Sequence, residues 1–173
     1  AGKSTLMNRL LGQKISIVTP KPQTTRNRIL GVVNGEDHQV VLLDTPGLHR
    51  ADQPLNREMV RIALESLQEV DVVLFLVDIS KFQSEELQQQ SKKEFAEYME
   101  KVDSHALLIL NKIDLVKKEK ILPMITQFAE LYPFSAVIPI SALQGDGTGM
   151  LLDELLKLLP MGPRYFPEDI PTD

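Results

Sequence analysis

The sequence predicts a doubly wound α/β fold, with a mostly parallel sheet, one antiparallel edge strand and helices on both faces. Short, continuously apolar runs at residues 72–77, 106–110 and 136–140 alternate with longer stretches of helical periodicity. This alternation is typical of parallel sheets built from strand–helix–strand units. An Asn-Gly pair at residues 34–35, between two β-rich runs, indicates a hairpin and so predicts the antiparallel edge strand.

Length and composition indicate one domain and exclude several classes of function. The 173 residues, 43% of them hydrophobic, are enough for one full core, which we expect over residues 1–160, with a linker over 161–173. The absence of cysteine excludes disulfides and cysteine-ligated metal sites. No apolar run has the length of a membrane span. A net charge of −5 argues against this stretch binding nucleic acid or anionic lipid broadly by itself.

The first quarter of the chain predicts a short helix, a loop and a hairpin. Leucines at helical spacing predict a helix over residues 4–11. Residues 15–18 are brief and apolar, and the two prolines within residues 19–26 indicate a loop. The β-rich runs 28–33 and 39–43 are expected to pair as the antiparallel hairpin at the sheet edge.

Further along the chain, four stretches carry apolar residues at the three- and four-residue spacing of helices. They are residues 54–67, 85–101, 118–131 and 150–159. Pro123 marks either the first turn of its helix or a kink. Among the apolar runs, residues 72–77 give the strongest signal of a buried strand.

The first residues resemble the back half of a phosphate-binding loop. Gly2, Lys3, Ser4 and Thr5 match the end of the pattern G-x-x-x-x-G-K-[ST]. In such a loop, backbone N–H groups surround phosphate oxygens, the lysine neutralises the terminal phosphates and the serine hydroxyl binds Mg²⁺. Because the chain opens inside this motif, we expect a strand before Gly2 in the native protein. The alternative for these residues alone is an ordinary frayed helix start.

Three polar motifs each follow the last apolar residue of a predicted strand. They are Asp-Thr-Pro-Gly at residues 44–47, Asn-Lys-Ile-Asp at 111–114 and Ser-Ala-Leu at 141–143. Ligands of doubly wound sheets bind beyond the carboxyl ends of the strands. We therefore expect all three motifs in one crevice.

The motif at residues 111–114 predicts recognition of guanine. A carboxylate at Asp114 accepts hydrogen bonds from the N1–H and 2-amino groups of guanine, whereas adenine has an acceptor at N1 and no 2-amino group. Asn111 is expected to reach the opposite edge of the base, and the stem of Lys112 to cross its ring. The segment after the next strand contributes a further contact. A backbone N–H of Ser141, Ala142 and Leu143 is expected to donate to the guanine carbonyl oxygen. For residues 111–114 alone, a capping Asp and a solvated Lys are the alternative.

The remaining motif predicts a metal and γ-phosphate side of the site. Asp44 is expected to hold Mg²⁺ through water, and the N–H of Gly47 to touch the γ-phosphate. Thr25 lies in a proline-bounded loop that can fold over a nucleotide and add a hydroxyl to the metal, with Thr24 as the alternative. The predicted metal ligands are thus Ser4, Thr25 and Asp44, and the residues predicted to act in catalysis are Lys3, Thr25 and Gly47.

Four segments give the chain a family resemblance: residues 2–8, 21–26, 44–49 and 165–169. With the guanine motifs, they make it similar to the translation-factor-class P-loop GTPases and, more narrowly, to the G domain of the Era family of bacterial GTPases. The resemblance implies a GTPase that cycles between GTP and GDP with Mg²⁺. It also implies a downstream KH-type domain that binds small-subunit rRNA during assembly of the ribosomal subunit, and some peripheral contact with the inner face of the cell membrane. We expect a cytoplasmic monomer.

Leu48 stands where Ras-like enzymes have a glutamine that orients the attacking water. A leucine side chain forms no hydrogen bond, so slow intrinsic hydrolysis is expected, with another group, a K⁺ ion or a partner supplying the missing function. Two alternatives stay open. One is a GTP-binding scaffold that does not hydrolyse, and the other is the G domain of a related GTPase of transfer-RNA modification or with tandem G domains.

Overall fold

The computed structural model describes residues 2–11, 15–17, 28–44, 65, 70–81, 96, 100 and 102–162. The chain divides into two compact units, which are described separately below. The first comprises Ala1–Arg9 and Asp71–Leu159, and the second Leu10–Val70 and Pro160–Asp173. Among the described residues, no helix is long and apolar enough to cross a membrane.

The first unit is built on three parallel strands in the order β4-β5-β6. These are β4 (Val72–Asp78), β5 (His105–Asn111) and β6 (Ala136–Pro139). Val72 pairs with His105 at one end of the β4–β5 ladder, and Asp78 pairs with Asn111 at the other. Pro139 lacks a backbone N–H and lies in β6, at an edge of this sheet, where a missing donor is tolerated. The predicted parallel α/β architecture is confirmed for this unit.

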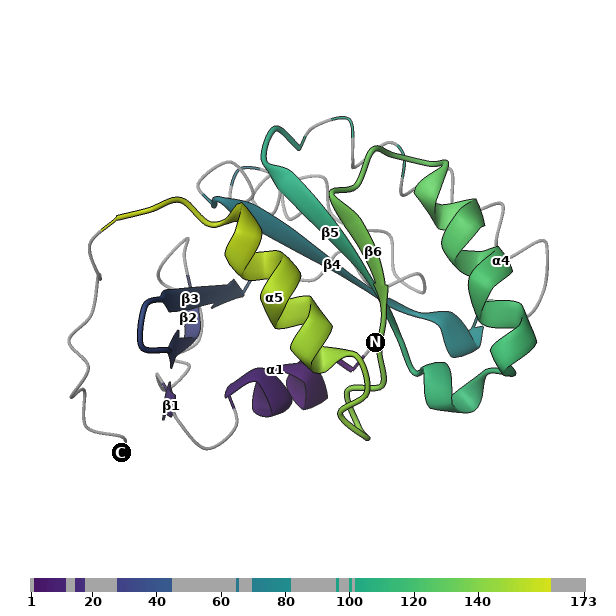
Figure 1. Cartoon of the computed structure of the whole chain (residues 1–173), viewed down its shortest axis with the longest axis horizontal. Coiled ribbons are helices and arrows are strands. Elements are labelled where there is room, and N and C mark those ends of the chain that lie inside the picture. Colours follow the sequence, from purple (N-terminus) through teal and green to yellow (C-terminus); the bar gives the residue numbers. More distant parts are fainter. Residues whose placement is uncertain are drawn as a thin grey trace. The chain divides into compact units, whose positions relative to one another are not determined.

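Three helices accompany these strands: α1 (Lys3–Leu11), α4 (Lys118–Ala129) and α5 (Thr148–Leu158). Figure 1 shows α4 and α5 on opposite sides of the sheet. Single 3-10 turns follow β4 and β5, at η1 (Ile79–Lys81) and η2 (Ile113–Leu115). The helices predicted at 4–11, 118–131 and 150–159 are therefore confirmed. Pro123 is the sixth residue of α4, beyond its first turn, so the carbonyl of Glu119 has no helical N–H partner.

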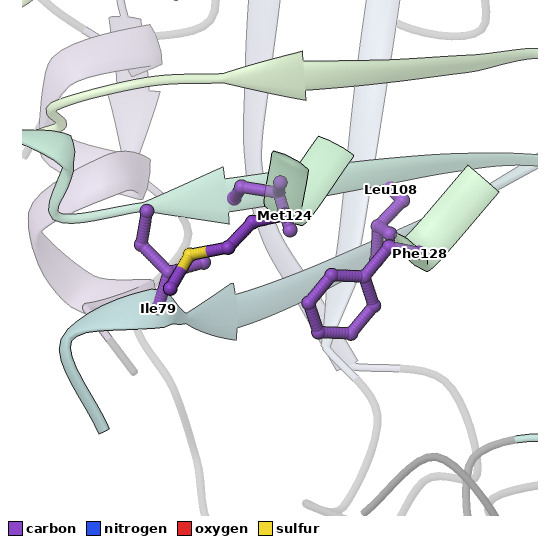
Figure 2. Packing of buried hydrophobic residues seen from close by; sticks show 5 residues of the cluster. Ile79, Leu108, Met124 and Phe128 are labelled. Carbon is purple, nitrogen blue, oxygen red and sulfur yellow. The ribbon is translucent and has the colours of Figure 1, made fainter. Parts of the chain in front are cut away.

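A cluster of buried side chains joins α4 to the sheet. Figure 2 shows Met124 and Phe128 of α4 beside Ile79 and Leu108, and Leu110 completes the cluster. Because successive side chains of a strand point to opposite faces, the buried Ile109, which lies between Leu108 and Leu110 on β5, faces the other side of the sheet. That is the side of α5, which buries Leu151 and Leu155. The strand β5 thus supplies core side chains to both layers of helices.

The central strand β5 is more deeply buried than its neighbour β4, although residues 72–77 give the stronger sequence signal of a buried strand. Residues 106–111 of β5 are all buried, whereas β4 has two buried and five half-buried residues. The reason is position, because β5 lies between two strands while β4 has one described neighbour in its sheet. The apolar content of a strand does not show whether that strand is central in the sheet.

The second unit contains an antiparallel sheet in the order β1-β2-β3. The predicted hairpin is confirmed as β2 (Arg28–Asn34) and β3 (Gln39–Asp44), closed by a hydrogen bond of 2.9 Å from Gly35 N to His38 O. The strand β1 (Ile15–Ile17) pairs with β2 and was not predicted. Three residues are too few to show strand periodicity, so only pairing defines this strand.

Several predicted segments lie outside the described residues. They are the loop at 19–26, the helix at 54–67 apart from Glu65, the helix at 85–101 apart from Ala96 and Glu100, and most of the linker at 161–173. Glu65 and Ala96 are both helical, as predicted for their segments.

From the α4 cluster we expect replacement of a buried leucine to lower the free energy of unfolding far more than replacement of an exposed one. Leu108→Ala should lower the free energy of unfolding by about 2–5 kcal/mol, because it removes a fully buried side chain and leaves a cavity. Leu122→Ala on α4 removes a side chain that is 70% exposed and should change stability by at most about 0.5 kcal/mol. Urea unfolding of both variants checks this, and equal losses would contradict the assignment of the core.

Candidate functional site

The carboxyl ends of the three parallel strands bring two predicted motifs together. β5 ends at Asn111 and leads into residues 112–114, and β6 ends at Pro139 and leads into residues 141–143. The N–H of Ile113 donates to the carbonyl of Ile140, 3.2 Å away, and ties the two segments to one another. The expectation that these motifs share one edge of the sheet is confirmed for the first unit.

The side chain of Asn111 links three segments of this edge. It is 2% exposed, and its Oδ1 accepts hydrogen bonds from the N–H groups of Lys112 and Ala142, at 2.8 and 3.0 Å. These two donors orient the amide, so its Nδ2 faces Gly2, where an added Cβ would lie only 2.3 Å away. Asn111 therefore acts as an internal brace, and its predicted contact with the edge of a base stays a prediction.

Gly2 begins the helical segment in a conformation that favours glycine. Its φ is +90°, and its carbonyl accepts a hydrogen bond of 2.9 Å from the N–H of Leu6 as α1 begins. Both the backbone angle and the close approach of Asn111 exclude a side chain here. The first turn of α1 contains Lys3, Ser4 and an exposed Thr5, so the predicted phosphate-binding residues stand at a helix N-terminus.

Asp114 presents an exposed carboxylate that a buried hydroxyl holds in place. Ser141 is fully buried, and its Oγ donates to Asp114 Oδ1 at 2.9 Å while accepting from the N–H of Gln144 at 3.2 Å. The backbone of Ser141 is itself fixed by a bridge to Asp146. A carboxylate oxygen has two lone pairs, so Asp114 can accept further hydrogen bonds from a ligand while Ser141 orients it.

Lys112 and Asp78 form an ion pair at the same edge. Lys112 has the left-handed backbone angles φ 70° and ψ 37°, which are uncommon for a residue with a side chain. Its Nζ lies 2.8 Å from Asp78 Oδ2, within the distance of an ion pair. The other oxygen, Oδ1, accepts from the N–H of Ser80 at 3.0 Å and from the Ser80 hydroxyl.

Burial by itself would raise the pKa of Asp78. The contact with Lys112 and the two Ser80 donors outweigh this effect and lower the pKa below its ordinary value of 3.8. Asp78 is therefore ionised at neutral pH, and the stabilisation from its partners is present above about pH 3.8 and is lost as the pH falls below that value.

Ala142 and Leu143 are held from the side of α1. The Nε of Arg9 donates to the carbonyl of Ala142 at 3.1 Å, and its Nη2 donates to the carbonyl of Leu143. The N–H of Ala142, predicted to meet a ligand carbonyl, donates to Asn111 in this structure. The side chain of Leu143 is 69% exposed.

Sequence reasoning missed Asp78, Ser80 and Arg9. A signal existed for Asp78, which follows the last apolar residue of β4 in the same way as Asn111 follows the last apolar residue of β5. No local signal existed for Arg9, since its acceptors lie more than 130 residues away along the chain.

The metal side of the predicted site is described only in part. Thr25 and Gly47 lie outside the described residues, as does Leu48. Asp44 is the last residue of β3, the strand-end position predicted for it, and it belongs to the second unit. The side chains of Lys3, Ser4 and Asp44 are not described. In the part of the chain that is described, no group of three or more His, Cys, Asp and Glu residues could hold a metal ion.

A parallel sheet with an Asn-Lys-x-Asp segment, a Ser-Ala turn and a close-packed glycine at a helix start defines the class of P-loop GTPases. The comparison with known families agrees, because the model of the 50S ribosome-binding GTPase family matches residues 1–112. The chain belongs to this family.

Several relatives of this chain are GTPases called Era. The chain is 47% identical over 173 residues to GTPase Era of Syntrophus aciditrophicus and 49% identical over 172 residues to that of Geotalea uraniireducens. Each alignment covers 99% of this chain, but 55% and 56% of the respective relative. The chain thus spans a little over half the length of these relatives, and the resemblance to the Era family is confirmed over this part.

Two solved structures of Era have the same fold. Era in complex with MgGDPNP and nucleotides 1506–1542 of 16S ribosomal RNA matches with a TM-score of 0.74 and 37% identity, over 98% of this chain and 56% of that one. A variant of Aquifex aeolicus Era bound to GDP and AlF4− matches with a TM-score of 0.74 and 38% identity, over 99% of this chain and 57% of that one.

We expect position 2, before α1, to accept no residue other than glycine. Gly2→Ala should weaken nucleotide binding and lower stability, because the new Cβ would displace the Asn111 brace at a backbone angle unfavourable for alanine. Gly149→Ala is the matched control, since Gly149 lies within α5 and its added Cβ meets nothing within 4 Å. That variant should gain up to about 1 kcal/mol from helix propensity. Nucleotide titrations and thermal melts compare the two, and equal effects would refute the role of Gly2.

Proposed function

We propose that this chain is the guanine-nucleotide-binding domain of a Mg²⁺-dependent, Era-like GTPase switch. The observation that carries the proposal is the hydrogen bond from Ser141 to Asp114, which holds an exposed carboxylate at the carboxyl edge of the sheet. On the same edge, Asn111 connects this carboxylate's segment to Gly2 at the start of the phosphate-side helix. The proposed base site and the proposed phosphate site therefore lie side by side at this edge of the sheet.

Base selection follows from the hydrogen-bonding capacity of Asp114. An ionised carboxylate has only acceptors, which match the N1–H and the 2-amino group of guanine. Adenine offers an acceptor at N1 and no 2-amino group, so its binding would desolvate the carboxylate without pairing it. Such a mismatch costs several kcal/mol, or about 10³-fold in affinity. Because Ser141 holds one carboxylate oxygen, little orientational entropy is lost when guanine binds.

At the phosphate end, the chain supplies a helix N-terminus, a cation and hard oxygen ligands. The first N–H groups of α1 have no helical partners and suit phosphate oxygens, while Lys3 neutralises the terminal phosphates. The hydroxyls of Ser4 and Thr25 and the carboxylate of Asp44 are ligand types that Mg²⁺ prefers, so they would hold the ion. When bound there, Mg²⁺ would supply positive charge that offsets the negative charge developing on the phosphate during transfer.

Hydrolysis is an in-line attack of water on the γ-phosphate, which breaks the bond to the β-phosphate bridging oxygen. By its motif, the N–H of Gly47 would touch the γ-phosphate, and loss of this contact after hydrolysis would release the segment that follows. Leu48 offers no hydrogen bond to the attacking water. The intrinsic rate is therefore slow, and K⁺ or a partner supplies the missing group.

In the intact protein, the switch acts in assembly of the small ribosomal subunit. Support comes from the related Era that was solved with a 16S ribosomal RNA fragment. The acidic balance of this chain leaves the RNA contact to a further domain, of KH type by family resemblance. A monomer in the cytoplasm, with peripheral contact at the inner face of the membrane, belongs to the same proposal and rests on that resemblance alone.

The central prediction is a strong preference for GTP over ATP. Titration of the intact protein with both nucleotides in the presence of Mg²⁺ should show GTP binding at least about 10³-fold more tightly. The physical reason is the unpaired Asp114 carboxylate in an adenine complex. Equal affinities, or tighter binding of ATP, would reject the proposed function.

Changing Asp114 should change the preferred base. In Asp114→Asn, the side-chain amide becomes a donor that suits the 2-carbonyl of xanthine, and it no longer accepts both guanine groups. We expect the affinity for GTP to fall by about 10³-fold and the preference to shift toward xanthosine triphosphate. Competition titrations measure both, and unchanged affinity for GTP would remove Asp114 from the site.

Leu48 favours a second candidate, a GTP-binding scaffold that does not hydrolyse. Single-turnover measurements with Mg²⁺, with and without K⁺, separate the candidates. We expect GDP to form slowly but above the uncatalysed rate, and faster with K⁺ if that ion supplies the missing function. No GDP above the uncatalysed rate under either condition would favour the scaffold.

A further inference from the structure

Lys112 directs its ammonium toward a buried carboxylate of the protein, Asp78, rather than toward water. A surface lysine ordinarily lays its stem on the protein and extends its ammonium into water. Here the ammonium reaches the Asp78 carboxylate, whose side chain is 5% exposed, while the Lys112 side chain as a whole is 36% exposed. The ammonium thus contacts a buried carboxylate, while part of the Lys112 side chain stays exposed.

A second contact places this stem next to the phosphate-side glycine. The Cε of Lys112 lies 4.0 Å from the point where a Cβ on Gly2 would be. The end of the stem therefore lies close to Gly2 before α1, while its ammonium contacts Asp78 at the end of β4.

Asp78 is itself held rigidly. Its Oδ1 receives both the N–H and the hydroxyl of Ser80 in the 3-10 turn η1, and its backbone pairs with Asn111 in the β4–β5 ladder. A fixed carboxylate of this kind defines the position of the lysine head far more narrowly than water would. The rotational freedom of four side-chain bonds is thus largely removed before any ligand arrives.

We propose that Asp78 is a positioning residue for purine binding, which fixes the Lys112 ammonium so that the lysine stem is held in one conformation against the purine face. This inference rests on the proposed function, since it takes the ligand to be a guanine nucleotide. Asp78 touches no ligand in this role. It acts through Lys112, and its effect is independent of the groups on the edge of the base.

Asp78→Asn tests the role with little change of shape. The asparagine oxygen can still accept from Ser80, but an amide replaces the oxygen that attracts Lys112. We expect the variant to bind GDP about 10-fold more weakly, mainly through faster dissociation. Glu154→Gln is the control, because it removes an exposed ion pair of 3.1 Å with Lys157 on α5 and should leave nucleotide binding unchanged.

Inosine diphosphate, which lacks the 2-amino group, separates positioning of the stem from reading of the base edge. A stem packed on the ring face does not sense that group, so Asp78→Asn should weaken GDP and inosine diphosphate by the same factor. Asp114→Asn should instead alter the ratio of the two affinities. A loss confined to GDP would show that Asp78 acts on the segment of Asp114, and it would overturn the proposal.

A double-mutant cycle establishes that Asp78 acts through Lys112. Lys112→Met keeps an unbranched apolar stem and removes the ammonium. In that background, Asp78→Asn should cause no further loss of affinity, and it relieves an uncompensated buried carboxylate. A further loss of about 10-fold in the double variant would mean that Asp78 works by another route, contrary to the proposal.

An effect on nucleotide affinity must be distinguished from a loss of folding in each variant. Each affinity is determined at a temperature where circular dichroism shows the variant to be folded. If Asp78→Asn does not fold, Ser80→Ala replaces it, because this change loosens Asp78 without removing its charge; it should weaken both nucleotides about threefold. A wild-type protein that binds no guanine nucleotide would reject the proposed function. A wild-type protein that binds, with Asp78→Asn equal to it, would reject only the inference.

Discussion

The buried amide of Asn111 is the interaction on which the arrangement of the site depends. One oxygen receives the N–H of Lys112 from its own strand end and the N–H of Ala142 from the next strand end, and the nitrogen faces Gly2. A side chain that is 2% exposed must satisfy its polar atoms within the protein. Asn111 therefore lies where three segments that are distant in sequence meet, and it contacts both the base side and the phosphate side of the proposed site.

Around this brace, two carboxylates at the same edge have different surroundings and different roles. Asp78 is buried, paired with Lys112 and bonded to Ser80, which lowers its pKa and uses its accepting capacity within the protein. Asp114 is exposed and accepts a hydrogen bond from Ser141, so accepting capacity remains for a ligand. Burial and partner number therefore separate a carboxylate that organises the protein from one that is suited to recognition.

Close approach of backbone segments is the second requirement of this architecture. Gly2 permits the contact with Asn111, and Gly147, at φ +77°, permits α5 to begin beside β6, since a Cβ there would lie 2.4 Å from the carbonyl of Pro139. The fold places α4 and α5 on opposite sides of one sheet, with β5 supplying core side chains to both. The buried central strand β5 ends at Asn111, so one strand contributes side chains both to the core and to the site.

The sequence by itself determined the parallel α/β class, the described strands other than β1, the described helices and the presence of two motifs at one sheet edge. Periodicity and strand-end position are local properties of a chain. Because the carboxyl ends of parallel strands lie at one edge of the sheet, these local properties also predict which motifs lie together. The tertiary structure alone decided that β5 rather than β4 is central, that residues 15–17 form a strand, and that Asn111 points inward. It also decided that Lys112 pairs with Asp78 and that Arg9 holds the segment of Ala142 and Leu143. These are contacts between residues far apart along the chain, and they depend on register and packing, which no local pattern records.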